Sequence, residues 1–369
     1  MSTFDPFKTG QIDLQYNQAR ELLENGLQEL LEHGSNLLKQ QKYEELKTFI
    51  TERTRGLNRD KDIRELRPYS LVDLEVEISQ DTEGLKTSWP AVDKLIRIPQ
   101  EALTIVAGQP SHGKTSVMLN MFINCVKQYP QKQFLFYSYE ENSKHLALKV
   151  LINMSECCFD ETNNFTHFEN IMKGNKIDNP KIEKAVKELE SMTSTRRLWL
   201  LDHGPDLDDL HNELSYLTKD GKVGGVFIDY VQKMKLKECS FDRQRELQVI
   251  SNELLRMAKT FKIPIIMGAQ LEKGKADEVV RLDQLREAGD IEQDANLILG
   301  VYNKSMIKAR QGVKVNDRLV DMTLSILKNR NGAVNEDVVL RFDRPVLKIR
   351  DFSNRNVMGG MTQRIQRLS

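Results

Sequence analysis

The sequence is poor in cysteine and has no excess of charge of either sign. Its four cysteines show neither C-x-x-C spacing nor pairing with nearby histidines, which argues against a structural zinc site and against a disulfide framework. The chain has 54 basic and 54 acidic residues, so its formal net charge is zero. This balance excludes a histone-like, broadly cationic protein, although clustered charge could still form a local basic channel for nucleic acid.

Long apolar runs are also missing. The N-terminus lacks the basic and then apolar segments of a signal peptide, and no stretch approaches the roughly 20 apolar residues of a membrane-spanning helix. Together with the cysteine usage, this predicts a protein of a reducing, cytoplasmic compartment that has no membrane partner. At 369 residues the chain can form one large domain with an appendage, or two domains.

The first 80 residues differ in pattern from the rest. Leucines recur at helical spacing over 14–31, and a second helical pattern covers about 35–54, before a charged connector. These helices could form a hairpin or pack on a neighbouring subunit. We therefore expect a small helical region and linker over 1–80, a larger domain over 81–352 and a flexible tail over 353–369.

The larger segment alternates short apolar runs with helical patterns, which predicts an α/β fold with a doubly wound, mainly parallel sheet. We expect strands near 103–107, 134–138, 198–201, 226–228, 263–267, 297–302, 322–327 and 338–342. We expect helices near 115–127, 144–156, 182–191, 208–217 and 245–261. In such sheets ligands bind at the carboxyl ends of the strands, so functional residues should directly follow them.

One run predicts a phosphate-binding loop. Residues 108–115, Gly-Gln-Pro-Ser-His-Gly-Lys-Thr, fit G-x-x-x-x-G-K-[ST] and lie between a predicted strand and a predicted helix, which makes an ordinary glycine turn the weaker interpretation. Lys114 would reach the β- and γ-phosphates of a nucleoside triphosphate, and the Thr115 hydroxyl would ligate Mg²⁺. We expect His112 to point away from the phosphates. The expected binding residues are Gly108, Ser111, Gly113, Lys114, Thr115 and Ser116.

Polar residues follow three other predicted strands. Glu140 could activate the water that attacks the γ-phosphate, or it could be a solvated acid at a helix start, which is the better interpretation of Glu141. Asp229 could hold Mg²⁺ opposite Thr115. Gln270 could sense the γ-phosphate through a hydrogen bond.

Lys328 and Arg330 lie two residues apart at the end of a late strand, before an Asn-Gly turn, so both should project to one face. They are either exposed hairpin charges or cations that reach a neighbouring subunit as an arginine finger does.

These separated motifs together resemble the ATPase domain of the DnaB-type replicative helicases over about 81–352. The matching runs are 108–115, 136–141, 228–234, 269–271 and 328–332, and the most specific is 285–295, Leu-Arg-Glu-Ala-Gly-Asp-Ile-Glu-Gln-Asp-Ala. The resemblance implies a RecA-like P-loop ATPase core, a ring of six subunits with ATP and Mg²⁺ bound between them, and movement along single-stranded DNA in replication.

The resemblance also assigns roles to individual residues. It implies that Glu140 is the catalytic base, that Asp229 helps to hold the metal ion and that Gln270 senses the γ-phosphate. It also implies that Lys328 and Arg330 reach into the ATP site of the neighbouring subunit. It assigns DNA-phosphate contacts in the central channel to Arg286, Glu287 and Gly289. From their charge, Lys273 and Arg281 could add to an electrostatic funnel for DNA.

The N-terminal region departs from the family pattern, because full-length members carry a globular helical domain that meets primase. The helix expected at 14–31 is then either a linker-type helix that packs on the adjacent subunit or a docking site for a loader or another replication partner. A shortened helicase would suit a bacterial, phage or mobile-element context. The alternatives to a helicase are a RecA- or RadA-like recombinase and a non-unwinding, ATP-gated scaffold or adaptor on DNA. The joint presence of Glu140, Asp229 and Arg330 argues against an inactive scaffold.

Overall fold

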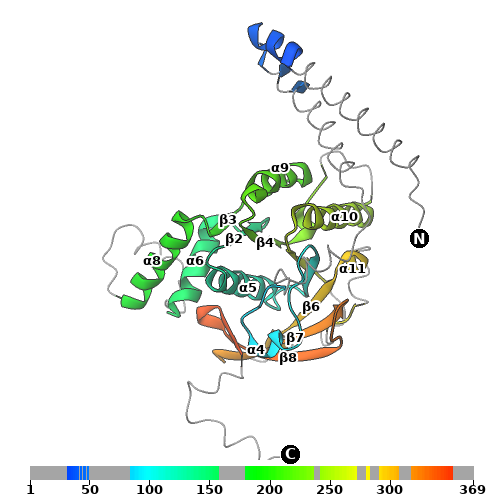
Figure 1. Ribbon diagram of the computed structural model, residues 1–369. Helices are drawn as coiled ribbons and strands as arrows, with labels where there is room; N and C mark the ends of the chain where they lie inside the picture. Colours follow the sequence, from blue (N-terminus) through cyan, green and yellow to red (C-terminus); the bar gives the residue numbers. More distant parts are fainter. Residues whose placement is uncertain are drawn as a thin grey trace, which may run out of the picture. The chain divides into compact units, whose positions relative to one another are not determined.

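The computed structural model describes residues 31–40, 42–43, 45–46, 48–49, 84–157, 179–236, 242–271, 280–282, 291–306 and 317–351 (Figure 1). Contacts within the chain divide it into two compact units, Met1–Asp81 and Thr82–Ser369.

The first unit contains a helical hairpin. Residues 31–39 form a continuous helix that ends in a turn at Gln40, and the described residues from 43 to 49 are again helical. A Cβ atom added to Gly34 would lie 3.6 Å from Cδ1 of Leu46, so the two stretches pack closely. The expected start of the second helix near 35 is therefore wrong. A glycine inside a helix costs about 1 kcal/mol relative to alanine, yet the helix continues through Gly34 over residues 31–39.

A mixed sheet forms the core of the second unit, and nine strands are described. Their order is β3-β2-β4-β5-β1-β6-β7-β8-β9. The strands are β1 (Leu103–Gly108), β2 (Gln133–Ser138), β3 (Leu198–Leu201), β4 (Val223–Asp229), β5 (Ile265–Gln270), β6 (Leu297–Tyr302), β7 (Leu319–Asn329), β8 (Glu336–Asp343) and β9 (Lys348–Asp351). The first six strands in this spatial order, from β3 across to β6, pair in parallel. The remaining three, β7, β8 and β9, pair in antiparallel fashion. The predicted α/β fold with a mainly parallel sheet is confirmed.

Helices cover both faces of the sheet (Figure 1). The longer ones are α5 (Lys114–Gln128), α6 (Ser143–Ser155), α8 (Pro180–Ser194), α9 (Leu207–Leu217) and α10 (Arg243–Phe261). The short ones are α4 (Pro90–Asp93), α11 (Ile291–Asp294), η2 (Thr218–Asp220), η3 (Val231–Lys233) and η5 (Arg344–Val346). Alternate residues of β1 face different clusters: Val106 joins the apolar cluster under α5, whereas Ile105 joins the one under α9 and α10. This alternation is what a doubly wound sheet requires.

All the expected strands and helices of this unit are present, with ends that shift by up to three residues, and β9, α4 and α11 were not expected. The shift of β5, which was expected at 263–267, has a physical reason. Proline has no N–H group to donate, so the strand starts after Pro264 and extends to Gln270.

Within the part of the chain that the structure covers, no helix combines the length and apolar character needed to cross a bilayer. Two cysteines, Cys125 and Cys157, are described, and both are free thiols.

Candidate active site

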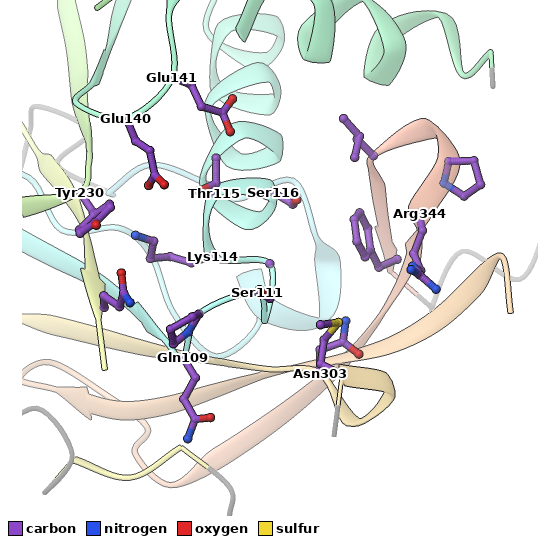
Figure 2. A pocket seen from close by; sticks show the side chains of 18 of the residues that line it. Gln109, Ser111, Lys114, Thr115, Ser116, Glu140, Glu141, Tyr230, Asn303 and Arg344 are labelled. Atoms are coloured by element: carbon purple, nitrogen blue, oxygen red, sulfur yellow. The ribbon is translucent and has the colours of Figure 1, made fainter. Parts of the chain in front are cut away.

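A pocket of about 1190 Å³ lies at the carboxyl ends of the parallel strands (Figure 2). The loop between β1 and α5 forms one wall, Glu140 and Glu141 follow β2, Tyr230 follows β4, and Gln270 ends β5. All six residues expected to bind nucleotide line the pocket, namely Gly108, Ser111, Gly113, Lys114, Thr115 and Ser116. Its volume is ample for a nucleotide-sized ligand.

The loop geometry depends on a left-handed backbone. Gly113 precedes α5 with a φ of 92°, and Ser111 has a φ of 68°. The positive φ of Gly113 favours glycine there, and a Cβ atom would in addition lie 2.6 Å from Cε of Met322 and displace the end of that side chain. The backbone N–H groups in the first turn of a helix have no partner within the helix. The first turn of α5 lines the pocket, so it offers these groups to an anion.

Asp229 joins the first two residues of α5. Its Oδ1 lies 3.0 Å from Nζ of Lys114, and its Oδ2 accepts a 2.7 Å hydrogen bond from Oγ1 of Thr115. The ammonium group also lies 3.9 Å from the ring centroid of Tyr230. Burial lowers the pKa of Lys114, while the charges of Asp229 and Glu140 oppose this shift. A buried carboxylate and a hydroxyl are thus held side by side, and both are oxygen ligands that Mg²⁺ accepts.

Gly268 makes this arrangement possible, and sequence reasoning missed it. A Cβ atom on Gly268 would lie 2.9 Å from Oδ1 of Asp229, 2.9 Å from Sδ of Met118 and 3.3 Å from Cδ of Lys114. The signal in the sequence is a glycine inside the otherwise apolar strand β5, which often marks a close approach.

The two carboxylates after β2 lie in different surroundings. Figure 2 shows the carboxylate of Glu140 on the side of Lys114 and Thr115. Glu141 instead forms an ion pair with Lys149 of α6, and its backbone N–H donates a 2.9 Å hydrogen bond to Ser138. The expectation that Glu141 lies in the N-cap region of a helix is confirmed, since it directly precedes Asn142, the N-cap of α6. It is not fully solvated, because Lys149 pairs with it and partly covers it.

His112 faces away from the pocket, as expected. Its imidazole is buried, and Nδ1 accepts a 3.2 Å hydrogen bond from the backbone N–H of Asn303. The ring centroid lies 5.8 Å from that of Tyr302. The histidine therefore packs the loop against the end of β6.

The far end of the pocket was not predicted. Its residues come from the end of β6 and from the turns around β7, β8 and β9, and they are Asn303, Met306, Asp317, Arg318, Phe342, Arg344, Pro345 and Leu347. No motif in the sequence connects these segments, so only the fold brings them to the phosphate-binding loop.

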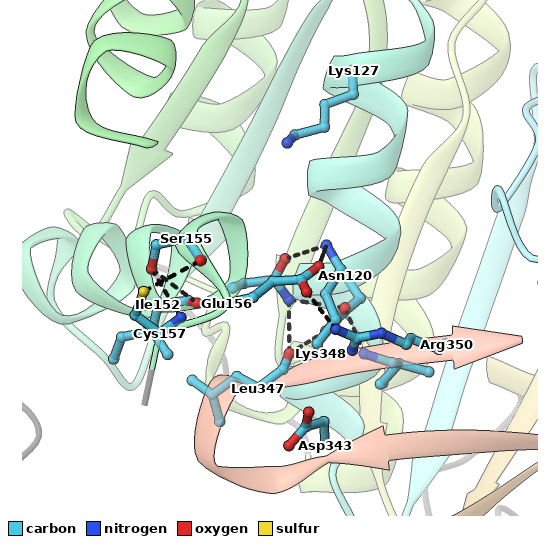
Figure 3. Close-up of polar contacts among 12 residues, drawn as sticks. Asn120, Lys127, Ile152, Ser155, Glu156, Cys157, Asp343, Leu347, Lys348 and Arg350 are labelled. Carbon is cyan, nitrogen blue, oxygen red and sulfur yellow. Dashed lines mark hydrogen bonds and ion pairs between the residues drawn. The ribbon is translucent and has the colours of Figure 1, made fainter. Parts of the chain in front are cut away.

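Asn120 ties the first turn of α5 to Leu347 and to the start of β9 (Figure 3). Its Nδ2 donates to the carbonyls of Ser116 and Leu347, both at 2.8 Å. Its Oδ1 accepts from Asn153 at 2.9 Å and from the backbone of Ile349 at 3.0 Å. These four bonds use the full capacity of a carboxamide.

A charged layer covers this network on the side of α6. Arg350 donates a 2.6 Å hydrogen bond to Glu156, and Lys348 donates a 3.2 Å bond to Oδ1 of Asn153 (Figure 3). Burial lowers the pKa of Lys348, and the charge of Glu156 opposes the shift. The start of β9 is therefore fixed to α6 as well as to α5.

Lys328 and Arg330 project to the same side, as expected. Nζ of Lys328 lies 2.6 Å from the carbonyl oxygen of Glu292, and a guanidinium nitrogen of Arg330 lies 2.6 Å from that of Gln293. Burial, and then the charge of Arg330, lower the pKa of Lys328. Among the residues that the structure describes, the lining of the pocket does not include either cation. The alternative of exposed hairpin charges holds for the position of Arg330, which is exposed in the turn after β7, whereas Lys328 is half-buried. Both side chains also bond the carbonyls of α11.

Most of the residues expected to bind DNA, namely Lys273, Arg286, Glu287 and Gly289, lie outside the described residues. Arg281 is described, and it is exposed beside the buried Val280.

The model of the family "DnaB-like helicase C terminal domain" matches residues 84–351. A probable replicative DNA helicase of Trieres chinensis is 31% identical over 280 residues, which cover 73% of this chain and 57% of the relative. The replicative DNA helicase DnaB of Mycoplasma genitalium is 30% identical over 269 residues, which cover 70% and 54%. The solved structure of a DnaB-like replicative helicase is similar in fold, with a TM-score of 0.71, 19% identity and coverage of 95% of this chain and 80% of that chain.

The chain thus spans just over half the length of the two curated relatives. Neither the recombinase nor the scaffold alternative is favoured by these matches.

Proposed function

The chain belongs to the family of DnaB-like helicase C-terminal domains, and we propose that it works as an ATP-dependent DNA helicase. It assembles as a homohexameric ring, moves along single-stranded DNA and unwinds the duplex in replication. The observation that carries this proposal is the contact of one buried carboxylate, Asp229, with both Lys114 and Thr115 at the head of the pocket. A lysine held beside a carboxylate and a hydroxyl suits phosphate groups together with Mg²⁺.

The pocket residues fit ATP with Mg²⁺. The phosphate-binding loop and Lys114 suit the phosphates, while the Thr115 hydroxyl and the Asp229 carboxylate supply hard oxygen ligands. When bound, Mg²⁺ neutralises part of the charge on the phosphate oxygens. At the far end, Phe342 and Arg344 offer a ring and a guanidinium plane on which a base can stack.

Each residue at the head of the pocket has a separate task in hydrolysis. Glu140 orients the attacking water and accepts its proton. Lys114 stabilises the negative charge that develops on the transferred phosphoryl group. The Gln270 carboxamide hydrogen-bonds to the γ-phosphate and loses this bond after hydrolysis.

Lys328 and Arg330 act on the site of the neighbouring subunit. Their position outside the lining of their own pocket supports this role, and their bonds to the carbonyls of Glu292 and Gln293 hold the pair in one orientation. A cation supplied in trans stabilises the transition state and raises the rate by about 10³- to 10⁵-fold where it operates.

DNA is gripped through its phosphates, without reading of sequence, by Arg286, Glu287 and Gly289, with support from Lys273 and Arg281. The N-terminal helical hairpin packs on the neighbouring subunit or docks a loader or another replication partner. We place the protein in the cytoplasm of a bacterium, in a chromosomal, plasmid or phage replication system.

The test is ATP hydrolysis with and without single-stranded DNA, beside mass determination of the assembly, with Glu140→Gln as control. A six-subunit ring whose hydrolysis DNA stimulates, and which Glu140→Gln inactivates, is the expected result. Hydrolysis that ignores DNA, or a filament in place of a ring, would reject the helicase.

A further inference from the structure

The side chain of Gln232 holds the backbone of Gln270. Nε2 of Gln232 donates to the carbonyl oxygen of Gln270 at 2.9 Å, and the N–H of Gln270 donates to Oε1 of Gln232 at 3.1 Å. Pairing between β4 and β5 ends at Ile228 and Met267, before the last residue of β5. The carboxamide of Gln232 thus replaces the missing peptide group of β4, and it satisfies both backbone groups of Gln270.

Gln232 is itself fixed to the start of α10. The guanidinium group of Arg243 donates to the carbonyls of Gln232 at 2.7 Å and Met234 at 3.0 Å. Arg243 also pairs with Glu246, which accepts a 2.9 Å hydrogen bond from the backbone of Leu236. The segment 231–236 is therefore bonded at one side to the end of β5 and at the other to α10.

The same segment meets the pocket a second time. Tyr230, which immediately precedes η3, lines the pocket, and its ring lies under the ammonium group of Lys114. A displacement of Lys114 would therefore act on the segment through Tyr230, and a displacement of Gln270 would act on it through Gln232. Because both the N–H and the carbonyl of Gln270 are bonded to the Gln232 side chain, a rotation of this backbone must either break two hydrogen bonds or move Gln232 with it.

We propose that Gln232 is a positioning residue that makes the end of β5 and the segment 231–236 move as one body. This inference rests on the proposed function of Gln270 as the γ-phosphate sensor. Gln232 does not touch the nucleotide: it sets the orientation of Gln270 and passes the change at the γ-phosphate to η3 and to the start of α10. Nucleotide state and DNA affinity are coupled through this pair.

The experiment measures the affinity of the full chain for single-stranded DNA with a non-hydrolysable ATP analogue and with ADP. The ratio of the two dissociation constants is the coupling. Gln232→Met keeps the length of the side chain and removes both hydrogen bonds, so it should reduce the coupling at least fivefold, while affinity for the analogue changes less than about twofold. Gln133→Met, at the amino end of β2, is the matched control and should keep the wild-type coupling.

A double-mutant cycle separates positioning from general structural damage. If Gln232 acts through Gln270, then Gln232→Met should change the coupling little in a Gln270→Ala background. Equal losses in both backgrounds would overturn the inference. Should Gln232→Met fail to fold, Gln232→Glu keeps the acceptor for the Gln270 N–H, loses the donor, and should show the same loss.

The two proposals fail in different ways. A wild-type coupling close to one would reject the proposed function and this inference with it. A clear wild-type coupling that survives Gln232→Met would reject the inference alone.

Discussion

The ammonium group of Lys114 lies 3.0 Å from Oδ1 of Asp229, and the two side chains are only 11% and 6% exposed. The partners stand at the ends of different strands, since Lys114 follows β1 through the phosphate-binding loop and Asp229 ends β4. Their charges compensate each other in a buried place, which makes the pair sensitive to loss of either member.

Lys114→Met should therefore destabilise the fold as well as abolish ATP hydrolysis. The substitution leaves the Asp229 carboxylate buried without its cation, a change that costs about 3 kcal/mol. Chemical unfolding measures the effect. The double variant Lys114→Met/Asp229→Asn should recover much of the lost stability but no hydrolysis, and a single variant as stable as the wild type would contradict the prediction.

Gly268→Ala should lower ATP turnover at least tenfold and destabilise the domain by about 1–3 kcal/mol, because the new methyl group pushes Asp229 and Met118 apart. Steady-state hydrolysis and thermal unfolding measure both effects. Gly225→Ala is the control, since a Cβ atom there meets nothing closer than 3.4 Å. Similar losses in the two variants would show that the close approach at Gly268 is unimportant.

Glu246 should make stability fall in acid. Burial raises the pKa of this carboxyl group, but hydrogen bonds from the Leu236 backbone and from Arg243, with the charge of Arg243, outweigh it, so the net shift is downward from 4.5. A folded-state pKa below the unfolded value means that the stabilisation is complete above about pH 4.5 and is lost as the pH falls through the folded-state pKa. Urea unfolding over this pH range should show a smaller loss for Glu246→Gln than for the wild type, and identical losses would refute the assignment.

The trans role of Arg330 can be checked by mixing two inactive chains. Arg330→Ala and Lys114→Ala subunits, combined in equal amounts, should form rings in which about one interface in four carries both intact halves. ATP turnover should therefore rise above that of either variant alone. No recovery on titration, while mass measurements show mixed rings, would mean that Arg330 does not act across the interface.

DNA binding should weaken steeply with salt, because phosphate contacts release counterions. Arg286→Ala should weaken binding to all sequences alike and reduce the slope of log affinity against log salt by about one. Fluorescence anisotropy over a salt series measures the slope. An unchanged slope would remove Arg286 from the contact surface.

Local patterns were enough to predict much of the fold and part of the site. Lys114, Thr115 and Asp229 follow strands whose apolar runs are evident in the sequence, so their meeting could be anticipated from the topology. Other contacts depend on how distant segments pack. Gln232 holds a backbone 38 residues away, and Lys328 binds a carbonyl 36 residues away. The partners lie in runs that the sequence analysis singled out, but nothing in those runs indicates that they are bonded to each other.

The same limit applies to turns and side-chain surroundings. The pattern around Gly34 predicts a break between two helices, yet one helix continues through this glycine over residues 31–39. The position of Glu141 after a strand predicts a solvated acid, yet Lys149 shields it. For Glu141, a partner eight residues further along the chain decides the surroundings.

The carboxamide of Asn120 has a consequence for how the nucleotide site and the edge of the sheet respond to each other. Its Nδ2 holds the carbonyls of Ser116 and Leu347, two residues that line the pocket, and its Oδ1 holds the backbone of Ile349 in β9. The first turn of α5 and the start of β9 cannot separate without breaking buried hydrogen bonds. A ligand that displaces the first turn of α5 therefore carries the start of β9 with it.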